Sequence, residues 1–266
     1  MYADSLDIAK IPPPDPDLLQ ETFAIGESLT ALDIDHTHIL QPYVYLDGIA
    51  LMEPTTTFTD LLITVVCFLA AWRLRKSPQR GKAFDFLWWF FVITGIATAC
   101  GGILGHGWAW YFGPQARFIG FAIGMFGVAA IERSSITWAN QYVTSEPLRK
   151  FFLVFNLVEI TFMLVYCAIT LHFKWVEFHS VYGFMVVVVG FHGYTYYKSK
   201  DQGSKFFLLN TINLLLVAYV FNRPVIIDEW FNHRDLAHVL MCVSMYILLV
   251  GGLNLGKRPG EQLSWW

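Results

Sequence analysis

Seven apolar segments separated by short polar connections constrain the fold of this chain more than any other feature. Each is close to the length of about 20 residues that a helix needs to cross roughly 30 Å of hydrocarbon. Charged residues make up only 15% of the chain, whereas a soluble domain carries about 25%. The sequence therefore predicts an all-α, multi-pass integral membrane protein built as a seven-transmembrane-helix bundle. The predicted spans are 56–74, 84–106, 116–138, 149–171, 176–197, 204–222 and 234–254.

These spans divide the chain into three regions. Residues 1–52 are polar to mixed and acidic, and we expect an extramembrane N-terminal arm through which protein partners can dock. The proline run at 11–16 excludes a helix there. Residues 53–256 are the expected seven-helix membrane domain, and 257–266 are a short tail. No basic region followed by an apolar stretch opens the chain, so we expect no cleavable signal peptide.

The number of lysines and arginines alternates between high and low from one connection to the next. The connections after the first, third and fifth spans and the tail carry most of them: Arg73, Arg75, Lys76, Arg80, Lys82, Arg149, Lys150, Lys198, Lys200, Lys205, Lys257 and Arg258. The opposite connections carry few: Arg117, Lys174, Arg223 and Arg234. Because short basic loops stay in the cytoplasm, the sequence predicts an N-terminus outside and a cytoplasmic C-terminus.

This orientation places most histidines on the outer side. The outer set is His36, His38, His106, His172, His179, His233 and His238, whereas His192 lies in the inner half. Glu53 and Asp60 fall at the same predicted depth as the outer set. Imidazoles together with carboxylates suit zinc or another first-row metal. The alternative is that these histidines are solvated or hydrogen-bonded caps at the membrane interface.

The start of the last span, Phe231 to His238, concentrates ionisable side chains where a membrane helix begins. Such groups are costly at that depth and indicate a functional site by default. Asp235 and His238 are three residues apart, about 60° on a helical wheel, and share one face. His233 and His238 are five apart, about 140°, and cannot face one point unless the helix start is unwound.

A second set of polar residues falls in the inner half of the predicted spans. We expect these side chains to pack helices against one another. The set is Glu132, Arg133, Asn156, Glu159, His192, Asn210 and Asn213.

The first two spans carry motifs that resemble those of a known superfamily. Glu53-Pro-Thr-Thr56-Thr-Phe-Thr59-Asp60 resembles the first-span motif of haemolysin III and adiponectin-receptor proteins. That motif reads Glu, two residues, Asn, two residues, Thr or Ser, then His, so Asp60 stands at the histidine position. Gly102-Ile-Leu-Gly-His106 resembles the second-span Ser-x-x-x-His motif of the same superfamily, which includes the alkaline ceramidases.

The resemblance implies a seven-span fold with a zinc ion held by three histidines, and several of these families hydrolyse the amide of ceramide. His106 carries over as a ligand, and so does His238, which matches the second histidine of the seventh-span His-x-x-x-His motif. The third ligand must then be Asp235, His233 or His179. The helical face that Asp235 shares with His238 favours Asp235.

The resemblance also implies a chemistry, hydrolysis of a membrane lipid amide or ester by water activated on zinc. Asp60 is the candidate general base or hydrogen-bond partner of a ligand, and Glu53 is the second candidate. Arg234 stands where the family has its first seventh-span histidine and cannot ligate a cation, so we expect it to hold an anionic head group or an oxyanion. Gly102 replaces the family's serine, and the third span, 116–138, has no counterpart of the usual aspartate near its outer end.

Three other functions remain open from the sequence. The chain could be a non-catalytic accessory subunit of a larger membrane complex, or a lipid-binding receptor. It could also carry two haems, because His179 and His192 are 13 apart on one helix, about 20 Å along its axis. That hypothesis lacks an inner histidine partner for His192. No phosphate-binding loop, dinucleotide fingerprint or Cys-x-x-Cys pair appears, and we expect no nucleic-acid partner.

Overall fold

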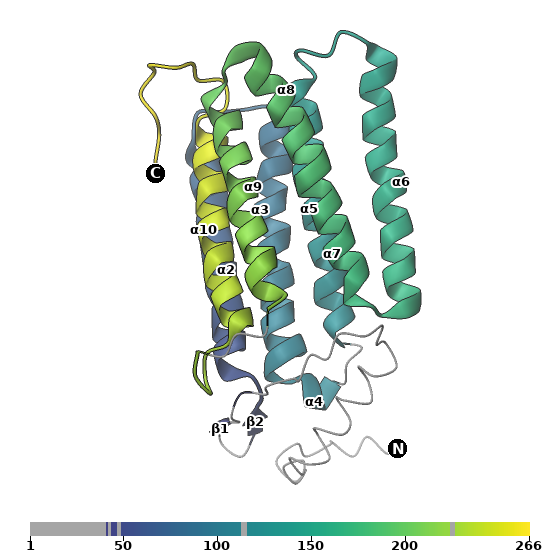
Figure 1. Ribbon diagram of the computed structural model, residues 1–266, viewed down its shortest axis with the longest axis vertical. Coiled ribbons are helices and arrows are strands. Elements are labelled where there is room, and N and C mark those ends of the chain that lie inside the picture. Colours follow the sequence, from purple (N-terminus) through teal and green to yellow (C-terminus); the bar gives the residue numbers. More distant parts are fainter. Residues whose placement is uncertain (1–40, 42–43, 47–48, 113–115, 224–226) are drawn as a thin grey trace, which may run out of the picture.

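The computed structural model describes residues 41, 44–46, 49–112, 116–223 and 227–266. Its long helices run side by side in one bundle, with a short β-hairpin and one short helix at one end (Figure 1). We call this the hairpin end and the opposite end, where the last helix stops at Leu253, the tail end. The predicted proline run and the His36/His38 pair lie outside the described residues.

The helices and strands follow one another with short connections. In chain order they are β1 (Val44–Leu46), β2 (Ile49–Leu51), α2 (Pro54–Lys76), α3 (Lys82–Cys100), η2 (Gly101–Gly107), α4 (Ala109–Phe112), α5 (Arg117–Ala139), α6 (Glu146–Thr170), α7 (Phe173–Val181), η4 (Tyr182–Val188), α8 (Val189–Ser199), α9 (Gln202–Phe221) and α10 (His233–Leu253). The two elements labelled η are π-helical: η2 continues α3, and η4 joins α7 to α8. β1 pairs with β2 in antiparallel register, with Val44 opposite Leu51.

The predicted helical bundle is confirmed. Among the described residues, seven helices are long and apolar enough to cross a membrane, and each coincides with one predicted span to within a few residues. The second of them runs from Lys82 to Gly107 and the fifth from Phe173 to Ser199, each counting its π-helical part. The hairpin was not predicted, because two strands of three residues are too short for an alternating pattern to be visible.

Local signals explain where several helices begin. Pro54 occupies the first turn of α2, where its missing N–H costs nothing. The Ser145 hydroxyl accepts a hydrogen bond from the Leu148 N–H at the start of α6, and the Asp201 carboxylate does the same for Ser204 at the start of α9. At the start of α10 a capping box is complete, with Asn232 as the cap.

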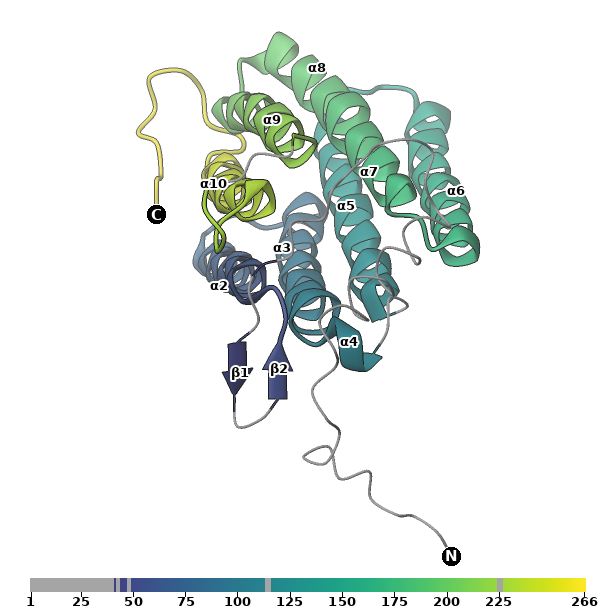
Figure 2. The same cartoon turned by 60° about the horizontal axis from the view of Figure 1, so that its bottom comes forward.

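The main core lies between α2, α3, α5, α9 and α10. α3 packs against α2 and α5, while α10 packs against α2 and α9 (Figure 2). Close approach of α5 to α3 depends on Gly120, because an added Cβ there would lie 3.3 Å from the Ala97 carbonyl oxygen. Large side chains that fill this core are Ile63, Leu87, Phe91, Ile131, Phe207 and Leu248.

α6 stands at the edge of the bundle, against α5 and α7 (Figures 1 and 2). Its outward face is apolar and exposed, with Phe151, Val154, Leu157, Phe162 and Ile169 on it. Two polar side chains in the middle of α6, Asn156 and Glu159, are by contrast buried and point inward. These two side chains therefore mark the inside of the bundle.

Each of the two π-helical segments lies next to a group of buried polar side chains, one near the hairpin end and one further inside the bundle. η2 packs against α2 near the hairpin end, and η4 packs against α5 and α9. Short π-helical insertions are rare and occur often at functional sites. Each also shifts the following side chains away from the direction that a regular helical wheel would give.

Candidate functional site

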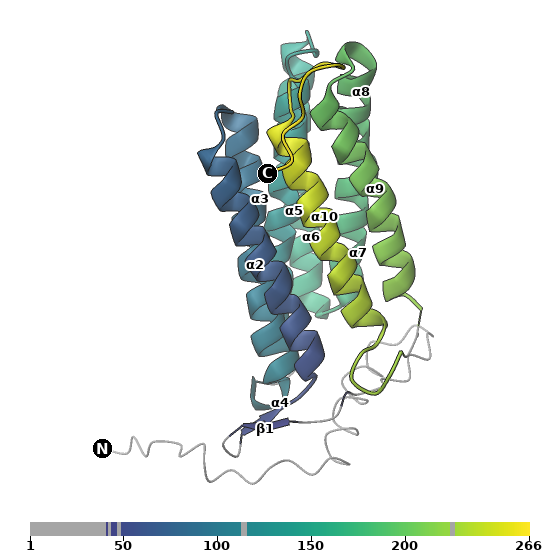
Figure 3. The ribbon, with the colours of Figure 1, turned by 90° about the vertical axis from the view of Figure 1, so that its left-hand side faces the viewer.

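Two predicted metal ligands from distant parts of the chain meet at the hairpin end. His106 comes from η2 and His238 from α10, and their ring centroids are 6.4 Å apart. Between them lies Asp60 of α2, whose carboxylate faces the Nε2 atoms of both rings. One Asp60 oxygen is 3.6 Å from Nε2 of His238, and the other is 3.9 Å from Nε2 of His106. The three residues come from the beginnings of α2 and α10 and from the end of η2. The beginnings of α2 and α10 both lie at the hairpin end of the bundle (Figure 3).

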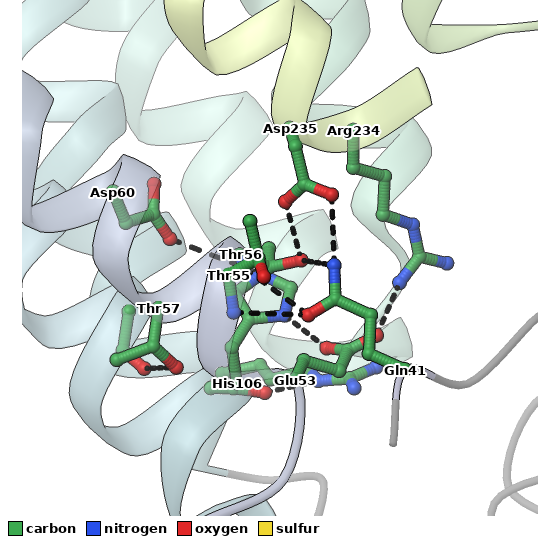
Figure 4. Close-up of polar contacts among 12 residues, drawn as sticks. Gln41, Glu53, Thr55, Thr56, Thr57, Asp60, His106, Arg234 and Asp235 are labelled. Carbon is green, nitrogen blue, oxygen red and sulfur yellow. Dashed lines mark hydrogen bonds and ion pairs between the residues drawn. The ribbon is translucent and has the colours of Figure 1, made fainter. Parts of the chain in front are cut away.

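Each imidazole is held through its other nitrogen. Nδ1 of His106 contacts the Glu53 carboxylate (Figure 4), and Nδ1 of His238 lies 3.0 Å from the Thr59 hydroxyl. Thr59 already donates its hydroxyl hydrogen to the Thr56 carbonyl oxygen at 3.1 Å. It must therefore accept a hydrogen bond from His238, whose Nδ1 then carries the hydrogen.

Glu53 is ionised in this arrangement. It lies just before α2 and is buried, and it also accepts a hydrogen bond from Arg234 at 3.1 Å. Burial by itself raises the pKa of the Glu53 carboxyl, but His106, Arg234 and Arg117 outweigh it and hold that pKa below its ordinary value. An ionised carboxylate only accepts hydrogen bonds, so Nδ1 of His106 is the donor.

The consequence is an excess of acceptors. A neutral imidazole with its hydrogen on Nδ1 has a lone pair on Nε2. Both Nε2 lone pairs then face the Asp60 carboxylate, which is 6% exposed and makes no hydrogen bond among the described residues. A proton shared between these groups, or a metal ion between them, would relieve this excess of acceptors. The donor types suit a metal ion with two nitrogen ligands and one oxygen ligand, but their ligand atoms do not all lie within 4.8 Å of one another.

Gly102 allows this approach. A Cβ added at Gly102 would lie 2.8 Å from the Cβ of Asp60 and 3.1 Å from the Thr57 carbonyl oxygen. The hydroxyl of Thr57 in turn donates to the Gly102 carbonyl oxygen at 3.2 Å. Glycine at position 102 therefore lets α2 and η2 lie in direct contact here.

Asp235, the residue favoured as the third ligand, has both carboxylate oxygens occupied by hydrogen-bond donors. One of its oxygens accepts from the Thr56 hydroxyl at 2.8 Å, and the other accepts from Gln41 Nε2 at 2.7 Å and Asn232 N at 2.8 Å (Figure 4). Gln41 also accepts hydrogen bonds from the backbone N–H groups of Thr55 and Thr56. Asp235 therefore joins the starts of α2 and α10, because a side chain in the first helical turn points back toward the cap.

His233 does not complete the site either. α10 begins at His233 as a regular capped helix. The unwinding that would let His233 and His238 face one point is therefore absent. His172, another of the outer histidines, is half-buried at the N-cap position of α7.

His179 lies elsewhere. It is fully buried on α7, with Nδ1 2.8 Å from Glu159 of α6 and Nε2 3.0 Å from the Met125 carbonyl oxygen of α5. Glu159 and the Met125 carbonyl oxygen lie so close to its two ring nitrogens that a haem has no room beside either of them. His192 is buried too, bonded to Ser204 and stacked on Phe207 with ring centroids 4.0 Å apart. The two-haem hypothesis disagrees with this geometry.

Arg234 and Glu53 are paired with each other. The Arg234 guanidinium binds Glu53, and the two Glu53 oxygens contact Arg234 and His106. Both residues therefore orient the His106 ring. Their expected roles, Arg234 holding an anionic group and Glu53 acting as a base, stay predictions.

Comparison with known proteins places the chain in one family. Residues 55–257, which contain Asp60, His106 and His238 and all of the long helices except the first residue of α2, match the model described as Family of unknown function (DUF6962). The comparisons with curated proteins and with solved structures gave no match. Because the match covers well over half of the chain, this protein belongs to the family of unknown function DUF6962.

Proposed function

We propose that this protein is a metal-dependent hydrolase of a membrane lipid amide or ester, with Asp60, His106 and His238 as the ligands of one divalent ion, zinc by its donor set. The observation that carries the proposal is the direction of the two imidazoles. Both Nε2 atoms face one buried carboxylate, and both Nδ1 atoms are held by a second group, Glu53 or Thr59. Metal-binding histidines characteristically donate their other N–H in this way.

The chain's own residues have distinct tasks in this proposal. Glu53 and Thr59 fix the orientation of the two rings, and Arg234 fixes Glu53. Asp60 offers two oxygens, so that one can bind the ion while the other accepts a proton from the attacking water. The chemistry that such an ion supplies is Lewis-acid activation of water for attack on a carbonyl carbon. Hydrolysis then adds water across the amide C–N or ester C–O bond.

A lipid substrate is supported by the position of the site and by the surface around the bundle. The site lies at one end of helices long enough to span a bilayer, and side chains exposed on α2, α6 and α9 are largely apolar. The basic connections all lie at the tail end, as the predicted orientation requires. We therefore place the hairpin end outside and the tail end in the cytoplasm, with the site near the outer surface.

Elemental analysis of the detergent-purified protein tests the metal. We expect about one equivalent of zinc at this site, lost on His238→Ala or Asp60→Asn, because removing one of three protein ligands takes most of the binding energy. His172→Ala is the matched control, since that histidine lies at the same end of the bundle, at the start of α7, and is only half-buried. Folded variants that retain all of the metal would overturn the assignment.

Turnover is tested separately. The wild-type protein should release fatty acid from at least one N-acyl or O-acyl lipid in a panel presented in mixed micelles, and a chelator should abolish that release. Reconstituted protein that binds such lipids without releasing fatty acid, with its metal in place, would support the receptor hypothesis instead.

A further inference from the structure

A second cluster of ionisable side chains lies inside the bundle, away from the hairpin end. Glu132 of α5, Glu159 of α6 and His179 of α7 each offer one ligand atom, and these atoms all lie within 4.8 Å of one another. All three side chains are buried. Three different helices contribute them, and helix packing alone does not need two carboxylates and an imidazole at one point.

The contacts of His179 leave its Nδ1 to be joined to a carboxylate. Its Nε2 faces the Met125 carbonyl oxygen, which only accepts, so Nε2 carries a ring hydrogen. Its Nδ1 lies 2.8 Å from Glu159 Oε1, where either a second ring proton or a metal ion beside the pair balances the carboxylate. A ligating histidine that donates its second N–H to a backbone carbonyl is the usual arrangement at a metal ion.

The two carboxylates each have an oxygen that lacks a partner. Glu132 Oε1 and Glu159 Oε2 are buried and make no hydrogen bond among the described residues. The other Glu132 oxygen accepts a hydrogen bond from Asn156, which is itself held by Arg133 at 2.8 Å. Leaving a charged oxygen buried and unpaired is costly. The orientation of Glu132 is thus fixed while its Oε1 atom lacks a protein partner.

Space is provided on both sides of Glu132. A Cβ added at Gly183 of η4 would lie 2.5 Å from Glu132 Oε1, so only glycine leaves room for this carboxylate. On the other side, a cavity of about 550 Å³ is lined by Glu132, Asn156 and Tyr182 and extends to residues 142–145, the connection between α5 and α6 at the tail end. An ion can approach Glu132 by this route without passing the hairpin end.

The geometry points to a second metal site, formed by Glu132, Glu159 and His179, that binds a divalent first-row transition-metal ion reached from the tail end. One imidazole nitrogen and two carboxylate oxygens are a suitable donor set for zinc or manganese, and the cavity beside Glu132 can supply water. This site is independent of the one proposed at the hairpin end, because the two share no residue.

Zinc stoichiometry of four proteins tests the inference and keeps the two sites distinguishable. With both sites real, we expect two ions per wild-type chain, one after Glu159→Gln, one after His238→Ala and none in the double variant. If only the second site exists, wild type and His238→Ala each hold one ion and Glu159→Gln holds none. A zinc content that Glu159→Gln leaves unchanged overturns the second site.

A second pair of variants tests the site without removing a ligand, so that a failure of Glu159→Gln to fold does not decide the result. Gly183→Ala displaces the Glu132 carboxylate without removing any ligand, whereas an added Cβ at Gly193 of α8 meets nothing within 4 Å. Titration with cobalt(II) in detergent, followed by its visible absorption, should show at least tenfold weaker binding at this site for Gly183→Ala in the His238→Ala background. Gly193→Ala should bind as its parent does. Equal cobalt affinity of the two folded glycine variants would contradict the site.

Discussion

Thr59 and Glu53 illustrate how much a single hydrogen bond decides at this site. Neither side chain touches the space between the two Nε2 atoms, yet each determines which nitrogen of its histidine carries the hydrogen. Thr59 can serve only as an acceptor for His238, because its own hydrogen is used on the Thr56 carbonyl oxygen. The tautomers of both rings therefore follow from their neighbours rather than from the histidines themselves.

Replacing Thr59 by valine tests this dependence. Valine keeps the shape of threonine but cannot accept the Nδ1–H of His238, so we expect zinc affinity to fall about 10–100-fold. Competition with a fluorescent chelator measures that change. Thr161→Val on α6 is the control, because that hydroxyl also bonds back along its own helix, to Leu157, but is exposed and lies on a different helix. Equal zinc affinities in the two variants would mean that Thr59 does not orient the ring.

The lowered pKa of Glu53 gives a pH dependence of known sign. A carboxyl whose pKa is lower in the folded than in the unfolded protein stabilises the fold above its unfolded pKa, and this contribution is lost as the pH falls. The melting temperature of the wild type should therefore exceed that of Glu53→Gln at pH 7. This difference should shrink as the pH falls below 4.5, the ordinary pKa of a glutamate. For Glu146→Gln, on an exposed ion pair with Lys150, the difference should stay near zero.

At the scale of elements, the starts of α2 and α10 are joined by one carboxylate. Asp235 accepts hydrogen bonds from Thr56 on α2, from Gln41 before the hairpin and from the cap residue Asn232. All three partners donate, so an amide at position 235 would turn its NH₂ toward a donor. These hydrogen bonds fix the position of the start of α10 against the start of α2. They therefore also fix the distance between His238 and Asp60.

Asp235→Asn separates this structural role from the ligand role that the sequence suggested. We expect a loss of stability of about 1–3 kcal/mol, the cost of buried donors left without an acceptor. Chemical denaturation in mixed micelles measures it. The folded fraction should keep the zinc content of the wild type. A variant of unchanged stability that has lost its zinc would return Asp235 to the ligand set.

At the scale of the whole molecule, the two ends of the bundle differ in charge and in content. The candidate hydrolase site lies at the hairpin end, and the lysines and arginines gather in the connections at the tail end. The cavity beside Glu132 also extends to the tail end. Orientation in the membrane therefore decides which compartment each site faces.

Cysteine labelling of intact cells tests the orientation. Lys174→Cys at the hairpin end and Lys150→Cys at the tail end replace the same residue type at well-exposed positions, with side chains 61% and 73% exposed. A membrane-impermeant maleimide should label Lys174→Cys directly and Lys150→Cys only after permeabilisation. Wild type measures the background from the four native cysteines. The reverse pattern would place the candidate hydrolase site in the cytoplasm.

The sequence by itself determined the elements of this fold. Seven apolar segments of spanning length become seven long helices, and Pro54 and Asn232 mark two of their starts, because these signals depend only on neighbours along the chain. His106 and His238 were likewise predicted to share one depth, since depth in a bundle follows from position along a helix.

Only the tertiary structure decided which carboxylate these histidines face. Spacing shows that Asp235 and His238 share a helical face, but not that Asp60 of another helix lies opposite while Asp235 binds Thr56 and Gln41. His179 likewise meets Glu132 and Glu159 because of how α5, α6 and α7 are rotated against one another. Those rotations depend on side-chain packing between helices, and η2 and η4 change them further by inserting π-helical turns. No periodicity within one segment contains that information.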